Sequence, residues 1–186
     1  MATPTTLPAA FVSGNVLTAA QLNDLRGAFR VLQVVSTAKT DTFSASVAAG
    51  AQTAVTGLSV AITPSSATSQ ILVMATVTMG VTTGANSMYF SLTKGGAQIG
   101  VGAAAGSRQQ ATGGAGASTD LDRTNSGGSI TFLDSPATTS ATTYAVTVGH
   151  TSGVTQTVYV NRNSNDGDLN YIFRTISTIT VMEISA

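Results

Sequence analysis

Apolar and polar residues alternate with a period of two along most of the chain, most clearly in residues 129–150. There a short apolar run, Ile130–Leu133, is stopped by the sequence Asp134-Ser135-Pro136. Alternation then resumes, with Tyr144, Val146 and Val148 on one face. A period of two is typical of a half-buried β-strand, and proline cannot donate to a strand ladder. This stretch therefore predicts a strand, a turn and a second strand.

Similar segments recur through the rest of the chain, separated by turn residues such as Lys94-Gly95-Gly96. The further predicted strands are Val34–Thr37, Thr42–Val47, Leu58–Ile62, Gln70–Met79, Met88–Thr93, Ala97–Val101, a short one near Arg108–Ala111, Val154–Asn161 and Phe173–Ile184. Roughly nine to eleven short strands at this spacing predict an all-β fold, a jelly-roll-like antiparallel β-sandwich. The last strand is too apolar for a free terminus, so we expect it in the centre of a sheet. The positions expected in core strands or in a trimer interface are Ile71, Val73, Tyr144, Ile179 and Val181.

The first 33 residues follow a different pattern. Residues 1–17 predict an extended N-terminal arm, because Pro4 and Pro8 exclude a helix. Phe11 and Val12 have no local apolar partner, so they either anchor the arm on another surface or belong to a frayed terminus. The arm and a following helix contribute the expected interaction residues, which are Pro4, Pro8, Phe11, Val12, Leu22, Leu25, Phe29 and Leu32.

Residues 18–33 predict one short amphipathic α-helix. Thr18 and Gln21 have the spacing of a capping box. An apolar stripe with a helical period follows, made of Leu22, Leu25, Phe29 and Leu32. A lone helix of this length is marginal in water. Its stripe must therefore pack on its own domain, on neighbouring copies or on another protein. The β-domain is expected to occupy residues 34–186.

The low charge of the chain is more informative about its function than any motif. Only 9% of the residues are charged, against about 25% in ordinary domains, and the formal net charge is +0. A sparsely charged surface suits a subunit that keeps much of its surface against neighbours, although a sparsely charged monomer is the alternative. The balance predicts no binding to nucleic acid through a basic field. No apolar run approaches the roughly 20 residues of a membrane span, and the first residues do not form a secretory signal, so no membrane partner is expected.

The candidates for chemistry are weak. His150 is the single histidine and has no evident partners, so it is expected to be a polar residue facing a loop. Asn163–Asp168 resembles half of a calcium loop but lacks the closing glutamate, and an Asx-rich β-turn explains the same residues. Gly100–Gly106 does not have dinucleotide-binding spacing. Asp120 and Asp122 lack a sugar platform nearby. We therefore expect no enzyme activity, no cofactor and no resident metal.

Several of these segments together resemble a group of structural proteins of tailed bacteriophages. The similar segments are Ile130–Tyr144, Val158–Arg162, Ser177–Ile184, Leu58–Pro64 followed by Gln70–Val73, and the N-terminal segment Val16–Asn23. The β-domain is also similar in pattern to the trimeric jelly rolls of tumour-necrosis-factor-like heads, in which the final strand lies near the threefold axis. The resemblance covers most of the chain, and Gly102–Gly128 is its least matched part.

The resemblance implies a virion protein made in the host cytoplasm. The first hypothesis is a capsid cement or decoration protein, a homotrimer on the capsid surface. Its arm and helix would bind the major capsid protein of the head shell. The alternative is the receptor-binding tip of a tail or neck fibre, with loops such as Gly102–Gly128 and Asn163–Asn170 contacting the host. The absence of long heptads that would form a stalk favours the first hypothesis.

Overall fold

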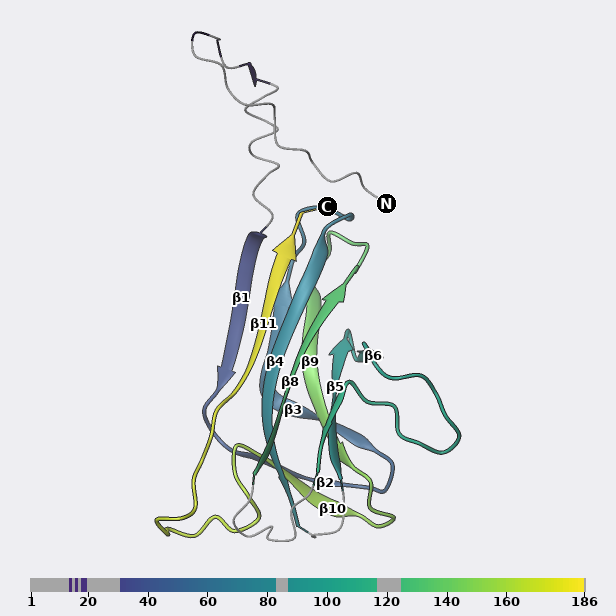
Figure 1. Cartoon of the computed structure of the whole chain (residues 1–186), viewed down its shortest axis with the longest axis vertical. Helices are drawn as coiled ribbons and strands as arrows, with labels where there is room; N and C mark the ends of the chain where they lie inside the picture. Colours follow the sequence, from purple (N-terminus) through teal and green to yellow (C-terminus); the bar gives the residue numbers. More distant parts are fainter. Residues whose placement is uncertain are drawn as a thin grey trace.

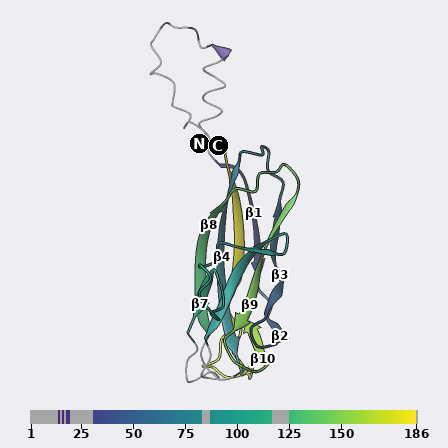
Figure 2. The same cartoon turned by 90° about the vertical axis from the view of Figure 1, so that its right-hand side faces the viewer.

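The computed structural model describes residues 14, 16, 18, 19, 31–82, 87–116 and 125–185. Within these residues the eleven regular elements are all β-strands. Two antiparallel sheets pack face to face, and Figure 2 separates them, with β8 and β3 on opposite sides. The prediction of an all-β antiparallel sandwich is therefore confirmed.

Sheet A is built around a long central strand, β4, which pairs with β11 and then β10 along one edge and with β8 along the other. The strands β1 and β2 pair with β11 and β10 and complete the sheet. The strands of sheet A are β1 (Val31–Lys39), β2 (Phe43–Val47), β4 (Gln70–Val81), β8 (Ser126–Asp134), β10 (Gln156–Val160) and β11 (Ser177–Ile184). The last strand is central, as the sequence predicts.

Sheet B has the order β3, β9, β5 and β6, and β7 continues the edge beside β5. Its strands are β3 (Gln52–Ile62), β5 (Met88–Lys94), β6 (Ala97–Ile99), β7 (Gly113–Ala115) and β9 (Thr142–His150). The predicted hairpin between β5 and β6 is confirmed. Lys94 pairs with Ala97, and both intervening glycines have positive φ (56° and 88°), as a tight two-residue turn requires.

The core lies between the two sheets and is formed by every second residue of the long strands. Ile71, Val73, Tyr144, Ile179 and Val181 all lie there, each with 0% exposure. In the single chain these five side chains are thus fully buried within their own sandwich. A contact between copies must use other residues.

Glycines let aromatic rings close the edges of this core. Phe90 of β5 lies against Gly128 of β8, where an added Cβ would be 2.4 Å from the ring. It also lies against Gly113 of β7, where the corresponding distance is 2.5 Å. The glycine-rich composition of this part of the chain therefore makes room for one ring between the sheets.

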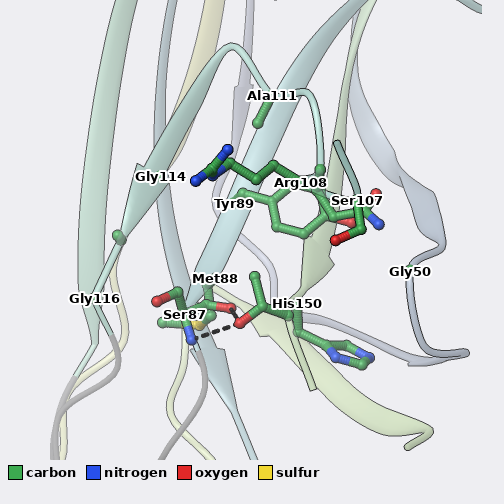
Figure 3. Close-up of a pocket in the computed structure, with 13 residues that line it drawn as sticks. Gly50, Ser87, Met88, Tyr89, Ser107, Arg108, Ala111, Gly114, Gly116 and His150 are labelled. Atoms are coloured by element: carbon green, nitrogen blue, oxygen red, sulfur yellow. Dashed lines mark hydrogen bonds between the residues drawn. The ribbon is translucent and has the colours of Figure 1, made fainter. Parts of the chain in front are cut away.

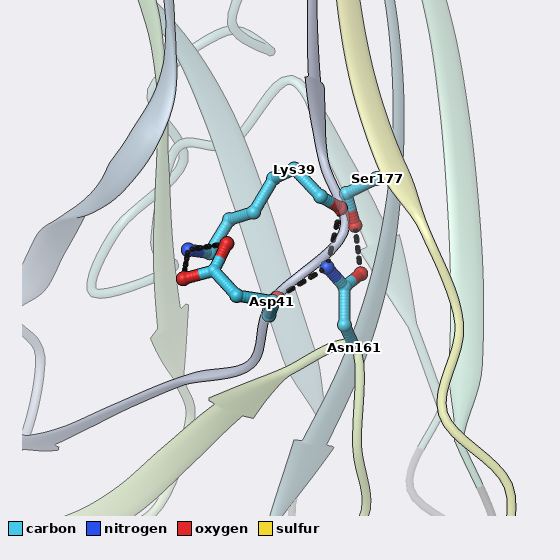
Figure 4. Close-up of polar contacts among 4 residues, drawn as sticks. All are labelled: Lys39, Asp41, Asn161 and Ser177. Atoms are coloured by element: carbon cyan, nitrogen blue, oxygen red, sulfur yellow. Dashed lines mark hydrogen bonds and ion pairs between the residues drawn. The ribbon is translucent and has the colours of Figure 1, made fainter.

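A buried asparagine, Asn161, links two connections between strands, the one from β1 to β2 and the one from β10 to β11 (Figure 4). Asn161 follows β10 with a positive φ of 63°, which asparagine tolerates better than most residues. Its Nδ2 donates to the backbone oxygens of Lys39 (2.8 Å) and Asp41 (2.9 Å), between β1 and β2. Its Oδ1 accepts a bond from Ser177 Oγ (2.6 Å) at the start of β11. The Asn161 side chain thus joins the β1–β2 connection to the β10–β11 connection.

Three sequence predictions need correction. Leu32 lies in β1 and not in a helix, because the backbone of β1 pairs with β11 from Val31 onward. The strand expected near Arg108–Ala111 is in fact β7, at Gly113–Ala115. The last strand begins at Ser177, and Phe173 lies in an exposed loop.

The N-terminal predictions fall largely outside the described residues. These include the arm residues Pro4, Pro8, Phe11 and Val12 and the helix residues Leu22, Leu25 and Phe29. No helical element is seen in the described part of the chain. Since β1 begins at Val31, the sandwich starts three residues before the predicted boundary at residue 34.

Candidate functional site

Where β1, β11, β4 and β8 lie side by side, the described outer face of sheet A carries no charged residue. Cross-strand register aligns Val34, Met182, Leu72 and Leu133 as one apolar row over β1, β11, β4 and β8. The next two rows are Ser36, Thr180, Met74 and Thr131, and then Ala38, Thr178, Thr76 and Ser129. We call these twelve residues the sheet A outer face. All are exposed or half-buried, and Val34 is 53% exposed.

The charged residues of sheet A point inward instead. The strands of sheet A contain only Lys39, Asp134 and Glu183 as charged residues, and all three are buried. A solvated sheet normally places its charges outside and its apolar residues inside. The strands of sheet A therefore hold their own charges within the sandwich and leave the outside neutral over β1, β11, β4 and β8. Beyond them, at β10, the Arg162 guanidinium lies 4.2 Å from the centre of the outward-facing Tyr159 ring.

Glu183 is satisfied entirely by neutral donors. Its Oε1 accepts bonds from the backbone N (2.7 Å) and Oγ (2.6 Å) of Ser65, and its Oε2 accepts one from Gln33 Nε2 (2.6 Å). Burial alone would raise the pKa of this carboxyl group. The hydrogen bonds to the ionised form outweigh burial and lower the pKa from its usual 4.5 to about 2. Glu183 therefore fastens the β3–β4 connection and β1 to β11.

Asp134 joins the two sheets. Its carboxylate lies 2.9 Å from Lys94 Nζ of β5 and accepts a bond from Tyr144 Oη of β9 (2.7 Å). Burial and the bond to this carboxylate strongly raise the pKa of Tyr144. The residue that the sequence assigns to a turn thus also links sheet A to sheet B.

His150 corrects the prediction of a loop-facing side chain. His150 is the last residue of β9 and is 0% exposed. Ring Nδ1 accepts a bond from the backbone N of Ser152 (3.1 Å), so the proton lies on Nε2, which bonds Val47 O (2.9 Å). β9 continues through residue 150, so the ring turns inward and fastens the end of β2. These bonds make it a structural histidine.

The outer face of sheet B is covered in part by the connection between β6 and β7, residues 100–112. Figure 1 shows this connection standing out from one side of the sandwich. It is held at its base by Thr112, whose Oγ1 accepts a bond from Leu92 N (2.9 Å) and donates one to Ile99 O (3.1 Å). Gln109 reaches across to Gly50 in the β2–β3 turn, where an added Cβ would be 3.3 Å from its Nε2.

Two neighbouring pockets flank this connection and share Gly50, Arg108 and Gln109. The larger has a volume of about 580 Å³ and contains Tyr89, Ser87 and Ser107 in its lining (Figure 3). The smaller, about 470 Å³, is more polar. Side chains in its lining include Gln52, Thr93, Gln98, Gln110 and Thr147. We call the two pockets together the sheet B groove.

In the Asn163–Asp168 loop the carboxylate of Asp166 pairs with arginine. Asp166 accepts bonds from Arg174 Nε (3.1 Å) and Nη2 (2.8 Å), and Arg162 lies 3.7 Å away. The bond from Arg174 lowers the pKa of Asp166. Gly167 N donates to Asn165 Oδ1 (3.0 Å), which is the Asx turn that the sequence predicts. Among the described residues, no group of three metal-ligating side chains is present.

The groove was not found from the sequence. The sequence pattern predicts a short strand at Arg108 and gives no reason to single out Gln52, Gln98 or Gln109. These residues lie on different elements and meet only because the β6–β7 connection passes over the sheet. The excess of glutamine beside the one arginine in 108–110 was the only local signal.

No family model matches the chain, and no curated protein matches it. Within the described residues, no helix has the length and apolar character needed to cross a membrane.

Proposed function

We propose that the chain is a structural protein of a tailed-bacteriophage virion, a homotrimeric capsid cement or decoration protein that catalyses no reaction. It sits on the capsid surface and binds the major capsid protein through its N-terminal arm and the segment after it. The observation that carries this proposal is the inverted charge pattern of sheet A. The resemblance noted in the sequence supplies the context of a virion.

The strand order supports the jelly-roll assignment. β1 with β2, β6 with β7 and β10 with β11 each act as one interrupted strand, which gives eight strands in all. The first pairs with the eighth, the second with the seventh, the third with the sixth and the fourth with the fifth. This is the pairing of one long hairpin rolled into two sheets, which is how a jelly roll is wound.

The sheet A outer face supports self-association. Burying a charge that has no partner is costly, so the centres of protein interfaces are depleted of charged residues. The twelve residues of this face include no charge, and Val34 and Leu133 leave about half of their surface in water in the single chain (53% and 45%). A neighbouring copy covering this face would bury them without stranding a charge.

The position of the chain ends supports a role for the N-terminal segment in binding. Val31 pairs with Ile184, so residues 1–30 join the sandwich at the end where β11 finishes (Figure 1). In a trimer with a symmetry axis along the strands, three such segments would leave from one end. Three linked contacts with a shell add avidity, and a protein that binds only the assembled shell stabilises it by mass action.

The proposal is tested in two measurements on the purified full-length chain. Sedimentation should give three times the mass of one chain. Deleting Ala2–Val12 should leave this trimer folded but abolish its binding to phage heads that lack the protein. A monomer at micromolar concentration would contradict the self-association, and unchanged head binding would contradict the role of the arm.

A second candidate function is the receptor-binding tip of a tail or neck fibre. The sheet B groove favours it, because a concave polar site on an exposed side is what a receptor-binding loop region provides. Under this candidate the purified protein should adsorb to host cells and block infection. Labelled virions would show the label on the tail instead of the head.

A further inference from the structure

The polar groups of the sheet B groove have hydrogen-bonding capacity that the described chain does not use. The Arg108 guanidinium makes one long bond, from Nη1 to Ala105 O (3.4 Å), and no ion pair with a described residue. The side chain of Gln109 bonds to none of the described residues. Gln52 uses only its oxygen, which accepts a bond from Thr147 Oγ1 (2.6 Å).

The other two glutamines of the groove, Gln98 and Gln110, use their amide nitrogen but not their amide oxygen. Gln98 Nε2 donates to Ser91 Oγ (3.2 Å), and Gln110 Nε2 donates to Gly102 O (2.7 Å). The carbonyl oxygen of each amide makes no hydrogen bond with the described residues. The groove thus presents unused amide donors and unused amide acceptors beside one cation that forms no ion pair with the described residues.

An aromatic ring forms part of the floor. Tyr89 lies on the outer side of sheet B in register with Gly149 of β9 and Gly114 of β7. An added Cβ on Gly149 would lie 2.7 Å from the tyrosine ring, so the glycine lets the ring lie flat on the sheet. Tyr89 Oη donates to Ala51 O (3.3 Å), which orients the ring. Figure 3 shows Arg108 and Ser107 on the same side of the sheet as this ring.

We infer that the sheet B groove binds a saccharide that carries a carboxylate, with Arg108 as the residue that takes the carboxylate. A guanidinium presents a planar fork of donors that matches a carboxylate. Sugar hydroxyls both donate and accept, as do the free ends of the glutamine amides. The volumes of about 580 and 470 Å³ lie within the range of about 300–1,000 Å³ usual for small-ligand sites.

The charge count favours a carboxylate over a phosphate. Arg108 is the only cation in the lining of the two pockets as described. One guanidinium balances the single charge of a sugar acid, whereas a phosphate monoester has close to two charges at neutral pH. A neutral sugar would leave the guanidinium without a partner. This inference does not rest on the proposed place of the protein in the virion, because the groove lies on the sheet opposite the sheet A outer face.

The test is a titration of the full-length protein followed by the NMR signals of its backbone amides. N-acetylneuraminic acid and glucuronic acid are the probes, with N-acetylglucosamine and inorganic phosphate for comparison. The acidic sugars should shift signals of groove residues such as Gly96, Gly114 and Thr147 in a saturable way. Arg108→Gln should weaken this binding at least tenfold, which is about 1.4 kcal/mol. Arg108→Lys, which keeps the charge but loses the fork, should bind with an intermediate affinity.

The matched control is Arg174→Gln, which removes the same charge from an exposed arginine outside the groove. It should bind the acidic sugars as the unchanged protein does. The oligomeric state of each variant, measured in parallel, separates this test from that of the proposed function. The inference is overturned if neither acidic sugar shifts the groove signals at about 10 mM. Equal binding of N-acetylglucosamine, unchanged binding by Arg108→Gln, or binding of phosphate alone would also overturn it.

Discussion

The outer sides of the two sheets differ although both are built from the same alternation of residues. Sheet A turns twelve uncharged side chains outward in three straight rows, and no described segment is hydrogen-bonded across them. Sheet B is overlaid by the β6–β7 connection, which creates pockets with an arginine and four glutamines. A flat neutral surface suits a large protein partner, whereas a polar concave one suits a small solute. On our two proposals, one sandwich serves two kinds of contact.

The same charge placed on each outer face should affect self-association on one face only. Thr76→Asp puts a carboxylate on the central strand β4, in the third row of the sheet A outer face, and Thr143→Asp puts one on an exposed position of β9 in sheet B. An unpaired charge in an interface costs roughly 3–5 kcal/mol. Thr76→Asp should therefore weaken self-association at least about 100-fold in sedimentation, and Thr143→Asp should leave it unchanged. Equal effects of the two substitutions would remove the distinction between the faces.

The second prediction concerns Glu183, one of the charged residues that sheet A keeps inside. The pKa of Glu183 is lower in the folded chain than its usual 4.5, so its ionised form stabilises the fold above about pH 4.5. That contribution, on the order of 3 kcal/mol, is lost as the pH falls toward 2. Glu183→Gln should lower the free energy of unfolding by a similar amount at pH 7 and by much less near pH 2. Denaturant unfolding at several pH values measures this.

The control for that measurement is Asp168→Asn, which neutralises an exposed carboxylate in the β10–β11 loop. Its unfolding curve should follow that of the unchanged chain at every pH. If Glu183→Gln keeps the full acid sensitivity of the unchanged chain, the buried carboxylate is not its source.

Two neighbouring glycines of β8 differ in packing, one on the inner and one on the outer side of sheet A. Gly128 and Gly127 are consecutive in β8, and only Gly128 faces the ring of Phe90. Gly128→Ala should destabilise the fold by about 1–3 kcal/mol through overpacking. At Gly127 the nearest atom is 3.8 Å from an added Cβ, so Gly127→Ala should change stability little. Thermal unfolding of both variants checks the difference, and similar losses would contradict the packing argument.

Much of the sandwich follows from local pattern, because strand periodicity and turn residues act over a few positions. β4 and β11 are visible from their apolar alternation, and the Gly95-Gly96 turn from its composition. The start of β3 was missed because Gly57, with a φ of 82°, interrupts the alternation at an irregularity between Ala54 and Ser59. Leu32 fits a helical stripe equally well, and only the pairing of its neighbours Val31 and Gln33 with Ile184 and Glu183 of β11 settles it as a strand residue.

The candidate surfaces depend on contacts that no local pattern records. The neutral face of sheet A becomes visible only when the register places Val34, Met182, Leu72 and Leu133 in one row. The buried position of Glu183 depends on Ser65 and Gln33, which are distant in sequence. The groove requires the β6–β7 connection to cross the sheet. Low charge in the composition hinted at a covered surface but could not say which one.

The pairing of Val31 with Ile184 has a practical consequence for labelling and display. A tag or fluorescent protein fused after Ala186 would emerge beside the point where residues 1–30 enter the sandwich. Such a fusion should hinder the binding that we propose for the N-terminal segment. The Gly95-Gly96 turn has open space around both residues, so a short epitope inserted there would leave both chain ends untouched, although it would lie beside the smaller pocket that Gly96 lines.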